Sequence, residues 1–370
     1  MSLRLAVLAF ASIFVLQPVA AETYSSEQND FRLVELADDL ERPWGMAFLP
    51  DGGMLITEQA GQLRLYRDGR LSDPIPGIPE AEERGQGGLL DVAVDPDYAE
   101  TGWIYLSLSG QGEGGLGTQV WRGRLEDGRW TDSEILFDMK DKTRAGRHFG
   151  SRFAFDSESR LYFSIGDRGA MDRAQDPADE AGRIHRIERD GTVPSDNPYL
   201  GDAGTPPTAY TRGNRNAQGM ARHPDTGVIW IHEHGPRGGD EVNVIRAGAN
   251  YGWPEVTHGI DYSGAVISER ESGPGVEDPV HVWVPSIAPS GMAFYSGAAF
   301  PEWQGDLFVG ALRSRLLVRL ELDGEQVIGE ERLLEDEVGR IRDVRVGPDG
   351  FVYLLTDSND GRLLRLEPAS

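Results

Sequence analysis

Short apolar stretches recur along the chain, each followed by a turn of Asp, Gly or Pro and a second apolar run. Such runs, rich in Val, Ile, Phe and Tyr on both sides of a turn, predict β-hairpins. The phrase occurs six times, as GMAFLPDGGMLITE from Gly45, LLDVAVDPDYAETGWIYLSLS from Leu89, SRFAFDSESRLYFSIGD from Ser151, GMARHPDTGVIWIHEHG from Gly219, GMAFYSGAAFPEWQGDLFVGALR from Gly291 and IRDVRVGPDGFVYLLTDS from Ile341. Sustained helical periodicity is scarce.

The six hairpins begin about 45 to 70 residues apart, which is the length of a propeller blade once two further strands and a loop are added. Hairpin phrases between them, such as GQLRLYRDGRL from Gly61, supply the outer strands. The pattern predicts an all-β fold, a six-bladed β-propeller, as a single domain over residues 30–368. The alternative is a β-sandwich or several small β-domains, but no low-complexity linker divides the chain.

The first 21 residues have the pattern of a secretory signal peptide. Arg4 precedes an apolar run from Leu5 to Leu16, and small residues then lead to a predicted cleavage after Ala21. A membrane anchor is the alternative, but this run of about twelve residues is shorter than the roughly twenty that a spanning helix needs. We therefore expect a soluble periplasmic or secreted protein without a membrane span.

Composition and charge narrow the classes of function. The chain has no cysteine, which excludes disulfides, thiolate metal sites and c-type haem. Its 61 acidic residues against 36 basic ones give a formal net charge of −25. Because such a field repels nucleic acid and anionic membranes, we expect neither as a partner. A neutral substrate such as a sugar and a divalent cation are compatible with it.

Polar residues stand where equivalent strands are expected to end. They are Glu58, Ser109, Asp167, Glu233, His234, Arg313 and Asp357. Equivalent strand ends surround the axis of a propeller, so these side chains can converge on one face. For Glu58, Ser109 and Asp357, simple capping of a strand in water is an equal alternative.

His148, in the segment GRHFGSR, stands just before the third repeat. A lone histidine is more often structural. Here, however, Asp167 ends the following strand of the same hairpin and can hydrogen-bond the ring, which fixes its tautomer and favours proton acceptance. His148 is therefore the candidate base among the seven histidines.

Arginines and amides occupy loop positions of three blades. They are Arg215, Asn216 and Gln218 in TRGNRNAQG, Arg313 at the end of the fifth repeat, and Arg340 and Arg342 in VGRIRD. Guanidinium groups bind carboxylates through two parallel hydrogen bonds, so the set predicts a polyanionic ligand. For any single arginine, an ordinary surface ion pair is the alternative.

The segment EHGPRGGDEVN is a candidate cation site. A constrained turn at Gly235 and Pro236 can present backbone carbonyls, and Asp240 and Glu241 follow it. Calcium accepts carbonyl and carboxylate oxygens, although no EF-hand loop is present in the sequence.

Eight segments in order resemble the soluble glucose and aldose sugar dehydrogenases that depend on pyrroloquinoline quinone (PQQ). They are QGGLLDVAVDP, RHFGSR, FSIGDRG, GNRNAQG, EHGPRGGDEVN, NYGWP, APSGMAF and GRIRDV, within a resemblance that runs from Arg32 to Glu367. It implies a six-bladed propeller that oxidises aldoses at the anomeric carbon to the lactone. PQQ and calcium would be the cofactors, and the electrons would pass to an external acceptor, a quinone or a separate carrier protein.

The same resemblance implies roles for individual residues. His148 would remove the proton of the anomeric hydroxyl, Asp167 would orient it, and Arg215 would polarise the quinone carbonyl. Cofactor contacts are implied for Gln86, Asn216, Gln218, Arg215, Arg313, Arg340 and Arg342. Backbone oxygens of Gly235 and Pro236 would bind the catalytic calcium, and Glu241 with the backbone of Tyr251 would bind a second, structural calcium.

The chain departs from the glucose dehydrogenases at three places. Arg147 stands where they carry an acidic residue, Arg313 replaces a lysine, and the loop from His258 to Pro279 does not match the loops that shape their sugar pocket. The resemblance is thus nearer to the broad aldose sugar dehydrogenases. Two alternatives remain open, a calcium-dependent lactonase on a similar propeller and a non-catalytic extracellular propeller that binds a ligand.

Overall fold

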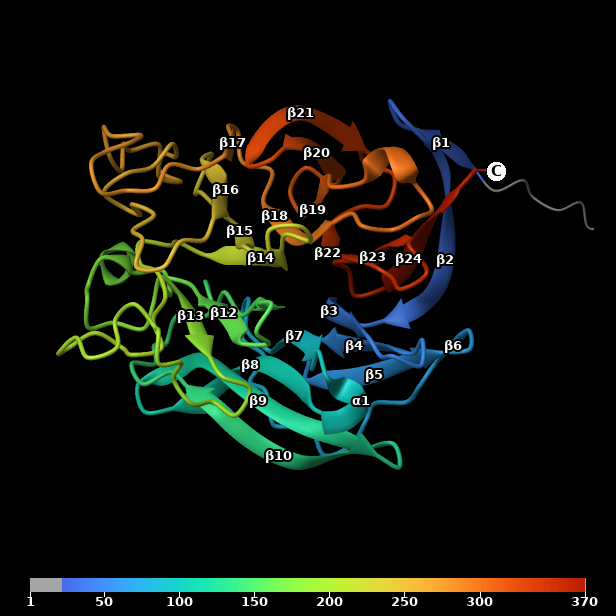
Figure 1. Ribbon diagram of the computed structural model, residues 1–370, viewed down its shortest axis with the longest axis horizontal. Coiled ribbons are helices and arrows are strands. Elements are labelled where there is room, and N and C mark those ends of the chain that lie inside the picture. The colour runs from blue at the N-terminus through green and yellow to red at the C-terminus, as the bar shows by residue number, and fades with distance from the viewer. Residues whose placement is uncertain (1–21, 370) are drawn as a thin grey trace, which may run out of the picture.

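The computed structural model describes residues 22–369, and this part of the chain is almost entirely β. Its helical elements are the short α1 (Tyr98–Thr101) and two single 3-10 turns, η1 (Met171–Ala174) and η2 (Pro301–Trp303). The strands form six antiparallel sheets around a central axis (Figure 1). The predicted signal peptide, residues 1–21, lies outside the described residues.

Each sheet is one blade, and its strands follow one another from the axis outwards. The first blade holds β3 (Pro43–Phe48), β4 (Met54–Glu58), β5 (Gln62–Arg67) and β6 (Arg70–Leu71), and the second β7 (Leu89–Val94), β8 (Ile104–Gly112), β9 (Gly115–Glu126) and β10 (Arg129–Asp138). The third holds β11 (Phe153–Phe155), β12 (Leu161–Ile165) and β13 (Arg183–Ile187), and the fourth β14 (Ala217–Arg222), β15 (Ile229–Glu233), β16 (Asp240–Val244) and β17 (His281–Trp283). The fifth holds β18 (Pro289–Phe294), β19 (Leu307–Ala311), β20 (Leu317–Asp323) and β21 (Gln326–Leu333), and the sixth β22 (Ile341–Val346), β23 (Val352–Thr356), β24 (Gly361–Pro368), β2 (Asp30–Leu40) and β1 (Thr23–Ser25).

The innermost strands form a closed ring. Each contacts its two neighbours, in the order β3, β7, β11, β14, β18, β22 and back to β3. In every blade the two inner strands are one of the six predicted hairpins, so the prediction of a six-bladed propeller is confirmed. The third blade is the irregular one, because a single bridge between His185 and Ala209 takes the place of a fourth strand.

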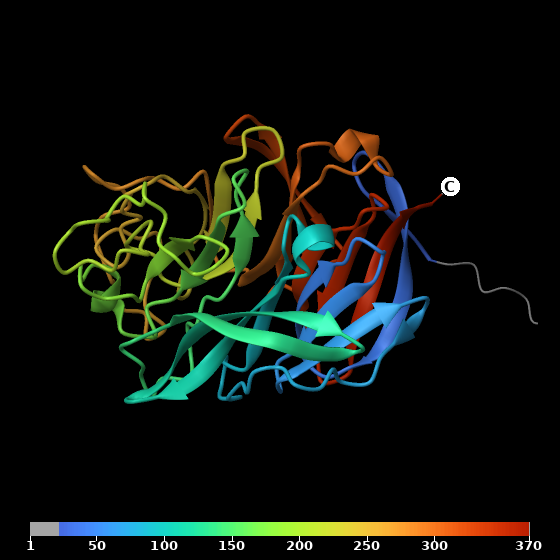
Figure 2. The same ribbon diagram turned by 60° about the horizontal axis from the view of Figure 1, so that its bottom comes forward.

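The sixth blade joins the two ends of the described chain. β2 pairs with β24 over a register from Phe31 opposite Pro368 to Leu40 opposite Gly361. Figures 1 and 2 show these blue and red strands side by side. Phe31 is fully buried, and its ring centroid lies 6.0 Å from that of Trp303 in the fifth blade. The N-terminal strand therefore closes the ring and also seals the contact between two blades.

Apolar side chains fill the spaces between successive blades. Phe137 of the second blade and Phe163 of the third have ring centroids 4.9 Å apart, and Trp230 of the fourth meets Phe294 of the fifth at 5.5 Å. Such aromatic pairs add to the hydrophobic gain of burying each blade face. Within residues 22–369, no helix is long and apolar enough to cross a membrane.

Candidate active site

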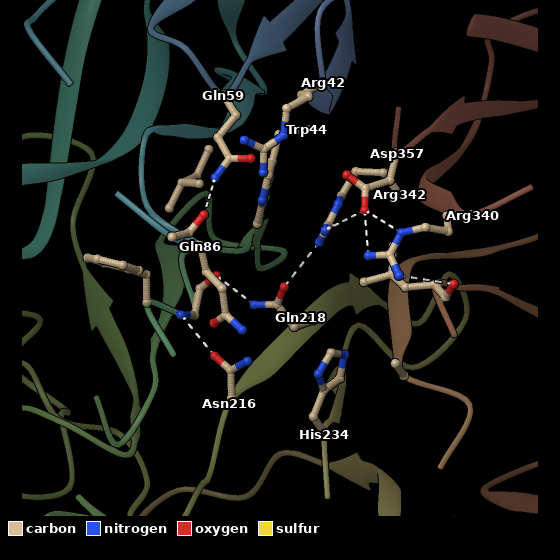
Figure 3. A pocket seen from close by; sticks show the side chains of 16 residues that line it. Arg42, Trp44, Gln59, Gln86, Asn216, Gln218, His234, Arg340, Arg342 and Asp357 are labelled. Carbon is tan, nitrogen blue, oxygen red and sulfur yellow. Dashed lines mark hydrogen bonds and ion pairs between the residues drawn. The ribbon is translucent and has the colours of Figure 1, made fainter. Parts of the chain in front are cut away.

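A pocket of about 300 Å³ lies at one end of the propeller axis (Figure 3). The hairpins are antiparallel, so the start of each inner strand and the end of the next strand meet at the same end of the axis. The pocket is lined at these positions by residues from five of the six blades and from the loop that enters the third. They are Arg42, Trp44, Gln59, Gly85, Gln86, Leu90, Phe149, Gly150, Asn216, Gln218, His234, Ala288, Leu312, Arg340, Arg342 and Asp357.

One wall of the pocket carries two arginines of the sixth blade. Arg340 donates from Nε and Nη2 to Asp357 Oδ2, at 2.8 and 2.6 Å. Arg342 donates to the same oxygen at 3.4 Å and to Gln218 Oε1 at 3.3 Å. Burial alone would raise the pKa of Asp357, but the two guanidinium groups hold that pKa below its usual value. Two positive groups thus share one carboxylate, which leaves the wall with net positive charge.

Across the pocket from Arg340, amide side chains hold the loop before the third blade. Gln86 Oε1 accepts from the His148 backbone N–H at 2.7 Å, and Asn216 Oδ1 accepts from Gly150 N–H at 3.2 Å. Gln218 Nε2 donates to Gly150 O at 3.2 Å. In Figure 3 these amides lie across the pocket from Arg340. They fix the backbone that presents His148.

Trp44 forms a flat aromatic surface of the pocket, supported from below by a buried cation. The Arg152 guanidinium lies 4.0 Å from the centre of the Trp44 ring. Arg152 is fully buried and pairs with Asp343 at 2.9 Å and with Asp91 at 3.3 Å. Its remaining donors bind the carbonyls of Gln218 and Arg342, at 2.7 and 2.9 Å. The axis beneath the pocket is therefore filled by a charge network that ties the third, second and sixth blades to the fourth.

His148 and Asp167 form the buried pair that the sequence predicts. The His148 Nδ1 atom lies 2.6 Å from Asp167 Oδ1, which also accepts from Gly169 N–H at 2.7 Å. Asp167 Oδ2 accepts from Trp253 Nε1 at 2.9 Å. His148 has a φ of +55°, a left-handed backbone that costs energy for a non-glycine residue and is often found at functional sites.

The charges around this pair leave Nε2 of His148 free to accept a proton. Burial would raise the pKa of Asp167, but hydrogen bonds from His148 and Gly169 hold it below its usual value, so Asp167 is ionised. An ionised Asp167 requires that Nδ1 of His148 donates. Burial lowers the pKa of His148, and Arg215 lowers it further, against the opposing hydrogen bond to Asp167. The imidazole is thus neutral near pH 7.

Arg215 lies beside this pair, at the start of the fourth blade. Its Nη1 atom donates to the carbonyls of His234, at 2.8 Å, and Gly235, at 3.4 Å. Its guanidinium lies 5.1 Å from the centre of the Trp253 ring. Its Nε atom is buried and has no hydrogen-bond partner among the described residues, so one donor remains for a ligand.

A second, small cavity of about 10 Å³ adjoins the turn at Gly235 and contains two acids. Glu233 accepts from Asn214 Nδ2 at 3.0 Å, and burial raises its pKa. Burial and the charge of Glu233 raise the pKa of Glu241 to about 8. Tyr251 lines the same cavity. Across residues 22–369, no group of three or more His, Asp or Glu side chains is placed to hold a metal, so a cation here would also need backbone carbonyls.

The structure brings most of the predicted site residues together, in two adjoining groups. Gln86, Asn216, Gln218, Arg340 and Arg342 line the main pocket. Arg215, Gly235, Glu241 and Tyr251 line the small cavity. His148 and Asp167 connect the groups through Gln86 and Trp253. Pro236 follows Gly235 in the turn but is not among the lining residues of either space.

Two predicted strand-end residues lie off the pocket by one position. Arg313 is exposed, whereas its neighbour Leu312 lines the pocket, so the cofactor contact of Arg313 stays a prediction. Glu58 accepts from the Glu41 backbone N–H at 2.7 Å, and the adjacent Gln59 lines the pocket instead. Successive side chains of a strand point to opposite sides, so an error of one residue changes the face.

Ser109 is fully buried and bonds only to backbone, so it neither lines the pocket nor caps a strand in water. Its hydroxyl donates to Glu82 O at 2.6 Å and accepts from Gly88 N–H at 2.7 Å.

Trp44 and Gln59 were not among the residues predicted from the sequence. Their positions in the sequence could have identified them as pocket residues, because Trp44 directly precedes the first repeat and Gln59 directly follows the second strand of that repeat.

The Glucose / Sorbosone dehydrogenase family model matches residues 40–365. The chain belongs to this family. An aldose sugar dehydrogenase of Escherichia coli is 44% identical over 340 residues, which cover 90% of this chain and 92% of that protein. A quinoprotein glucose dehydrogenase of Acinetobacter calcoaceticus is 26% identical over 438 residues, covering 95% and 90%. The family resemblance seen in the sequence is confirmed.

Solved structures of this family agree with the fold. The apo form of a soluble aldose sugar dehydrogenase from Escherichia coli superposes with a TM-score of 0.89 at 43% identity, covering 91% of this chain and 99% of that one. The PQQ-bound form of an aldose sugar dehydrogenase from Streptomyces coelicolor gives 0.75 at 27% identity, covering 91% and 98%.

Proposed function

We propose that this protein oxidises aldose sugars to lactones with PQQ held in the pocket of Figure 3, and passes the electrons to an external acceptor. Membership of the Glucose / Sorbosone dehydrogenase family makes it a sugar oxidoreductase, and a relative has been solved with PQQ bound. The propeller of residues 30–368 would carry this function after export and removal of residues 1–21. The observation that carries the proposal is the pair of arginines, Arg340 and Arg342, which line one pocket together with the amide side chains of the loops opposite Arg340.

The chemistry of the pocket fits PQQ, a flat aromatic quinone with three carboxylates. Guanidinium groups of Arg340 and Arg342 suit carboxylates, and Trp44 offers a flat ring for stacking. The Nε atom of Arg342, like that of Arg215, is buried without a partner among the described residues. Buried donors are normally satisfied, so both arginines have capacity for a bound anion.

The protein residues perform the proton chemistry. When bound, PQQ supplies the acceptor for the hydride that leaves the anomeric carbon. His148 takes the proton of the anomeric hydroxyl on Nε2, because Nδ1 is engaged by Asp167. Asp167 holds the ring and stabilises its protonated form. Arg215 supplies a fixed positive charge that stabilises the negative charge developing as the hydride arrives.

We also propose calcium as a second cofactor. Carbonyls of His234 and Gly235 already converge on one positive charge, the Arg215 guanidinium, which supports a cation bound by Gly235 and the adjoining Pro236. Burial raises the pKa of Glu233, and burial together with the charge of Glu233 raises that of Glu241. A calcium bound by Glu241 and the backbone of Tyr251 would relieve this repulsion.

The contacts on the axis disfavour a lactonase with a carboxylate cage in the channel. Asp91 and Asp343, two buried acids on the innermost strands β7 and β22, are already paired with Arg152 and Arg345, at distances of 2.9 to 3.4 Å. A metal there would have to displace the fully buried Arg152 and the partly exposed Arg345, at a high cost in free energy.

Reconstitution tests the proposed function. Purified apo-protein is mixed with PQQ, CaCl2 or both, and dye reduction is followed with a panel of aldoses. We expect activity only when both are present. Arg340→Ala should require more PQQ, whereas Arg332→Ala, which removes an exposed arginine of β21, should not. Sugar-dependent dye reduction without PQQ, or with a nicotinamide instead, would contradict the proposal.

A further inference from the structure

Four large apolar side chains are exposed together near the Gly235 turn. They are Ile260, Tyr262, Val266 and Val284, with 41%, 68%, 57% and 67% of their surface exposed, and we refer to them as the apolar rim. They make up half of the large exposed apolar side chains within residues 22–369. Single exposed apolar residues are ordinary, but a cluster marks an interaction surface.

Short segments of the chain connect the apolar rim to residues that line the pocket. The Arg237 backbone N–H donates to Ile260 O at 3.2 Å, and Ile260 bridges to Val266. On the other side of the turn, a methyl group added at Gly238 would lie 3.3 Å from Val284. The turn directly follows His234, and Val284 precedes Ala288 by four residues; both His234 and Ala288 line the pocket. The rim therefore borders the proposed cofactor site.

The segment that carries the rim is acidic. Residues 255–284 contain Glu255, Asp261, Glu269, Glu271, Glu277 and Asp278 against the single base Arg270. Arg270 pairs with Glu255 at 3.6 Å, and His258 lies 3.7 Å from Glu271. The other four acids form no ion pair with any residue that the structure describes. An apolar surface surrounded by uncompensated acids is complementary to a partner with an apolar contact surrounded by bases.

We propose that the apolar rim docks a small basic redox protein that receives the electrons, an inference that rests on the proposed sugar oxidation. Oxidation of one aldose to its lactone releases two electrons and two protons. Two molecules of a one-electron carrier are then reduced, and the two protons pass to solvent. The rim suits this step because it borders the pocket while leaving the pocket residues free for sugar and cofactor. Electrostatic steering by the acids would speed the encounter.

Mitochondrial cytochrome c, a small basic haem protein, is a suitable probe. With the PQQ- and calcium-loaded enzyme and saturating aldose, we expect cytochrome c reduction whose rate falls steeply as salt is raised from about 10 to about 200 mM. Val284→Ser and Tyr262→Ser should each raise the KM for cytochrome c on the order of tenfold, as loss of an interface anchor does. Dye reduction should not change. Ile135→Ser is the matched control, because Ile135 is 44% exposed on β10 of the second blade, whereas the rim belongs to the fourth.

Paired charge variants give a second measurement. Glu269→Gln with Glu277→Gln should flatten the salt dependence of cytochrome c reduction and leave dye reduction unchanged. The proposal is overturned if the dye-active enzyme does not reduce cytochrome c, or if the rim variants and Ile135→Ser have the same KM. Loss of dye reduction in the unmodified enzyme would instead contradict the proposed sugar oxidation, so the two failures are distinguishable.

Discussion

His148 combines burial, a left-handed backbone and an ionised partner, and this environment sets its pH dependence. Burial lowers its pKa below the usual value of about 6.5, and a base must be neutral to accept a proton. The rate should therefore rise with pH through an ionisation below about 6.5 and then level. A profile of kcat/KM against pH measures this. Asp167→Asn removes the hydrogen bond that raises the pKa, so the acid limb should move to still lower pH.

Replacement of His148 tests whether it is the base. His148→Gln should lower kcat by roughly two to four orders of magnitude, the usual contribution of a positioned base. PQQ binding, followed by titration of the cofactor absorbance, should change little. His281→Gln, at a partly exposed histidine that pairs with Glu330, is the control. Near-normal turnover of His148→Gln would assign proton removal to another group.

The arginines of the site should divide into two classes. Arg215 lies beside the His148 pair, so Arg215→Ala should lower kcat on the order of 100-fold, the scale of one lost transition-state donor. Arg340 and Arg342 lie on the opposite wall, so their alanine variants should raise the PQQ concentration needed for half-maximal activity and leave kcat nearly normal at saturation. Steady-state kinetics over a range of PQQ concentrations separates the two effects. Identical behaviour of the two classes would refute this division.

Residue-level prediction from the sequence succeeded where a side chain has its own local signal. Asn216 and Arg340 could be found because they stand immediately before a repeat, where the chain enters the axis. Trp44 occupies a comparable position, but a tryptophan there is typical of a hydrophobic core. Its role in the pocket depends on Arg152, which is distant in sequence but whose guanidinium lies 4.0 Å from the centre of the Trp44 ring. Arg313 shows the opposite error, because it was predicted to line the pocket and does not. Only the exact register of the chain decides that Leu312, and not Arg313, points inward.

At the level of elements, the inner hairpins were predictable and the closure of the ring was not. Each hairpin has both strands and its turn within about 25 residues, so the pattern is visible locally. The pairing of β2 with β24 joins residues such as Arg32 and Glu367, which form an ion pair at 2.7 Å. Nothing in the sequence near either strand specifies the partner. The loss of a fourth strand in the third blade was likewise not visible.

The closing strand should contribute much of the stability of the sixth blade. Phe31→Ala deletes a fully buried ring that packs on Trp303, and it should lower the free energy of unfolding by about 3–5 kcal/mol. Urea denaturation followed by tryptophan fluorescence measures the change. Ile328→Ala, at an exposed position, should cost less than about 0.5 kcal/mol. Equal effects of both would mean that β2 is dispensable for closure.

At the scale of the whole molecule, cofactor binding should stabilise the fold. Arg340 and Arg342 of the sixth blade line the main pocket together with residues of four other blades. A cofactor bound there therefore requires the intact ring. A ligand at a hundredfold excess over its Kd adds about 2.7 kcal/mol to the free energy of unfolding. The melting temperature should therefore rise with PQQ and CaCl2 together, and EDTA should reverse part of the rise. An unchanged melting temperature would show that neither ligand binds the folded protein.

The pairing of β2 with β24 also orders the events of folding in time. During synthesis β1 and β2 emerge first and β24 last, so this N-terminal pair of strands cannot join the rest of its blade until the final strand has been made. Five blades can pair their strands as they appear, because their hairpins are local. The sixth blade cannot be completed until the C-terminal strand has been made, and until then the ring of the nascent chain stays open. The closed ring can therefore form only after the whole chain has been made, even though five of its blades can form earlier.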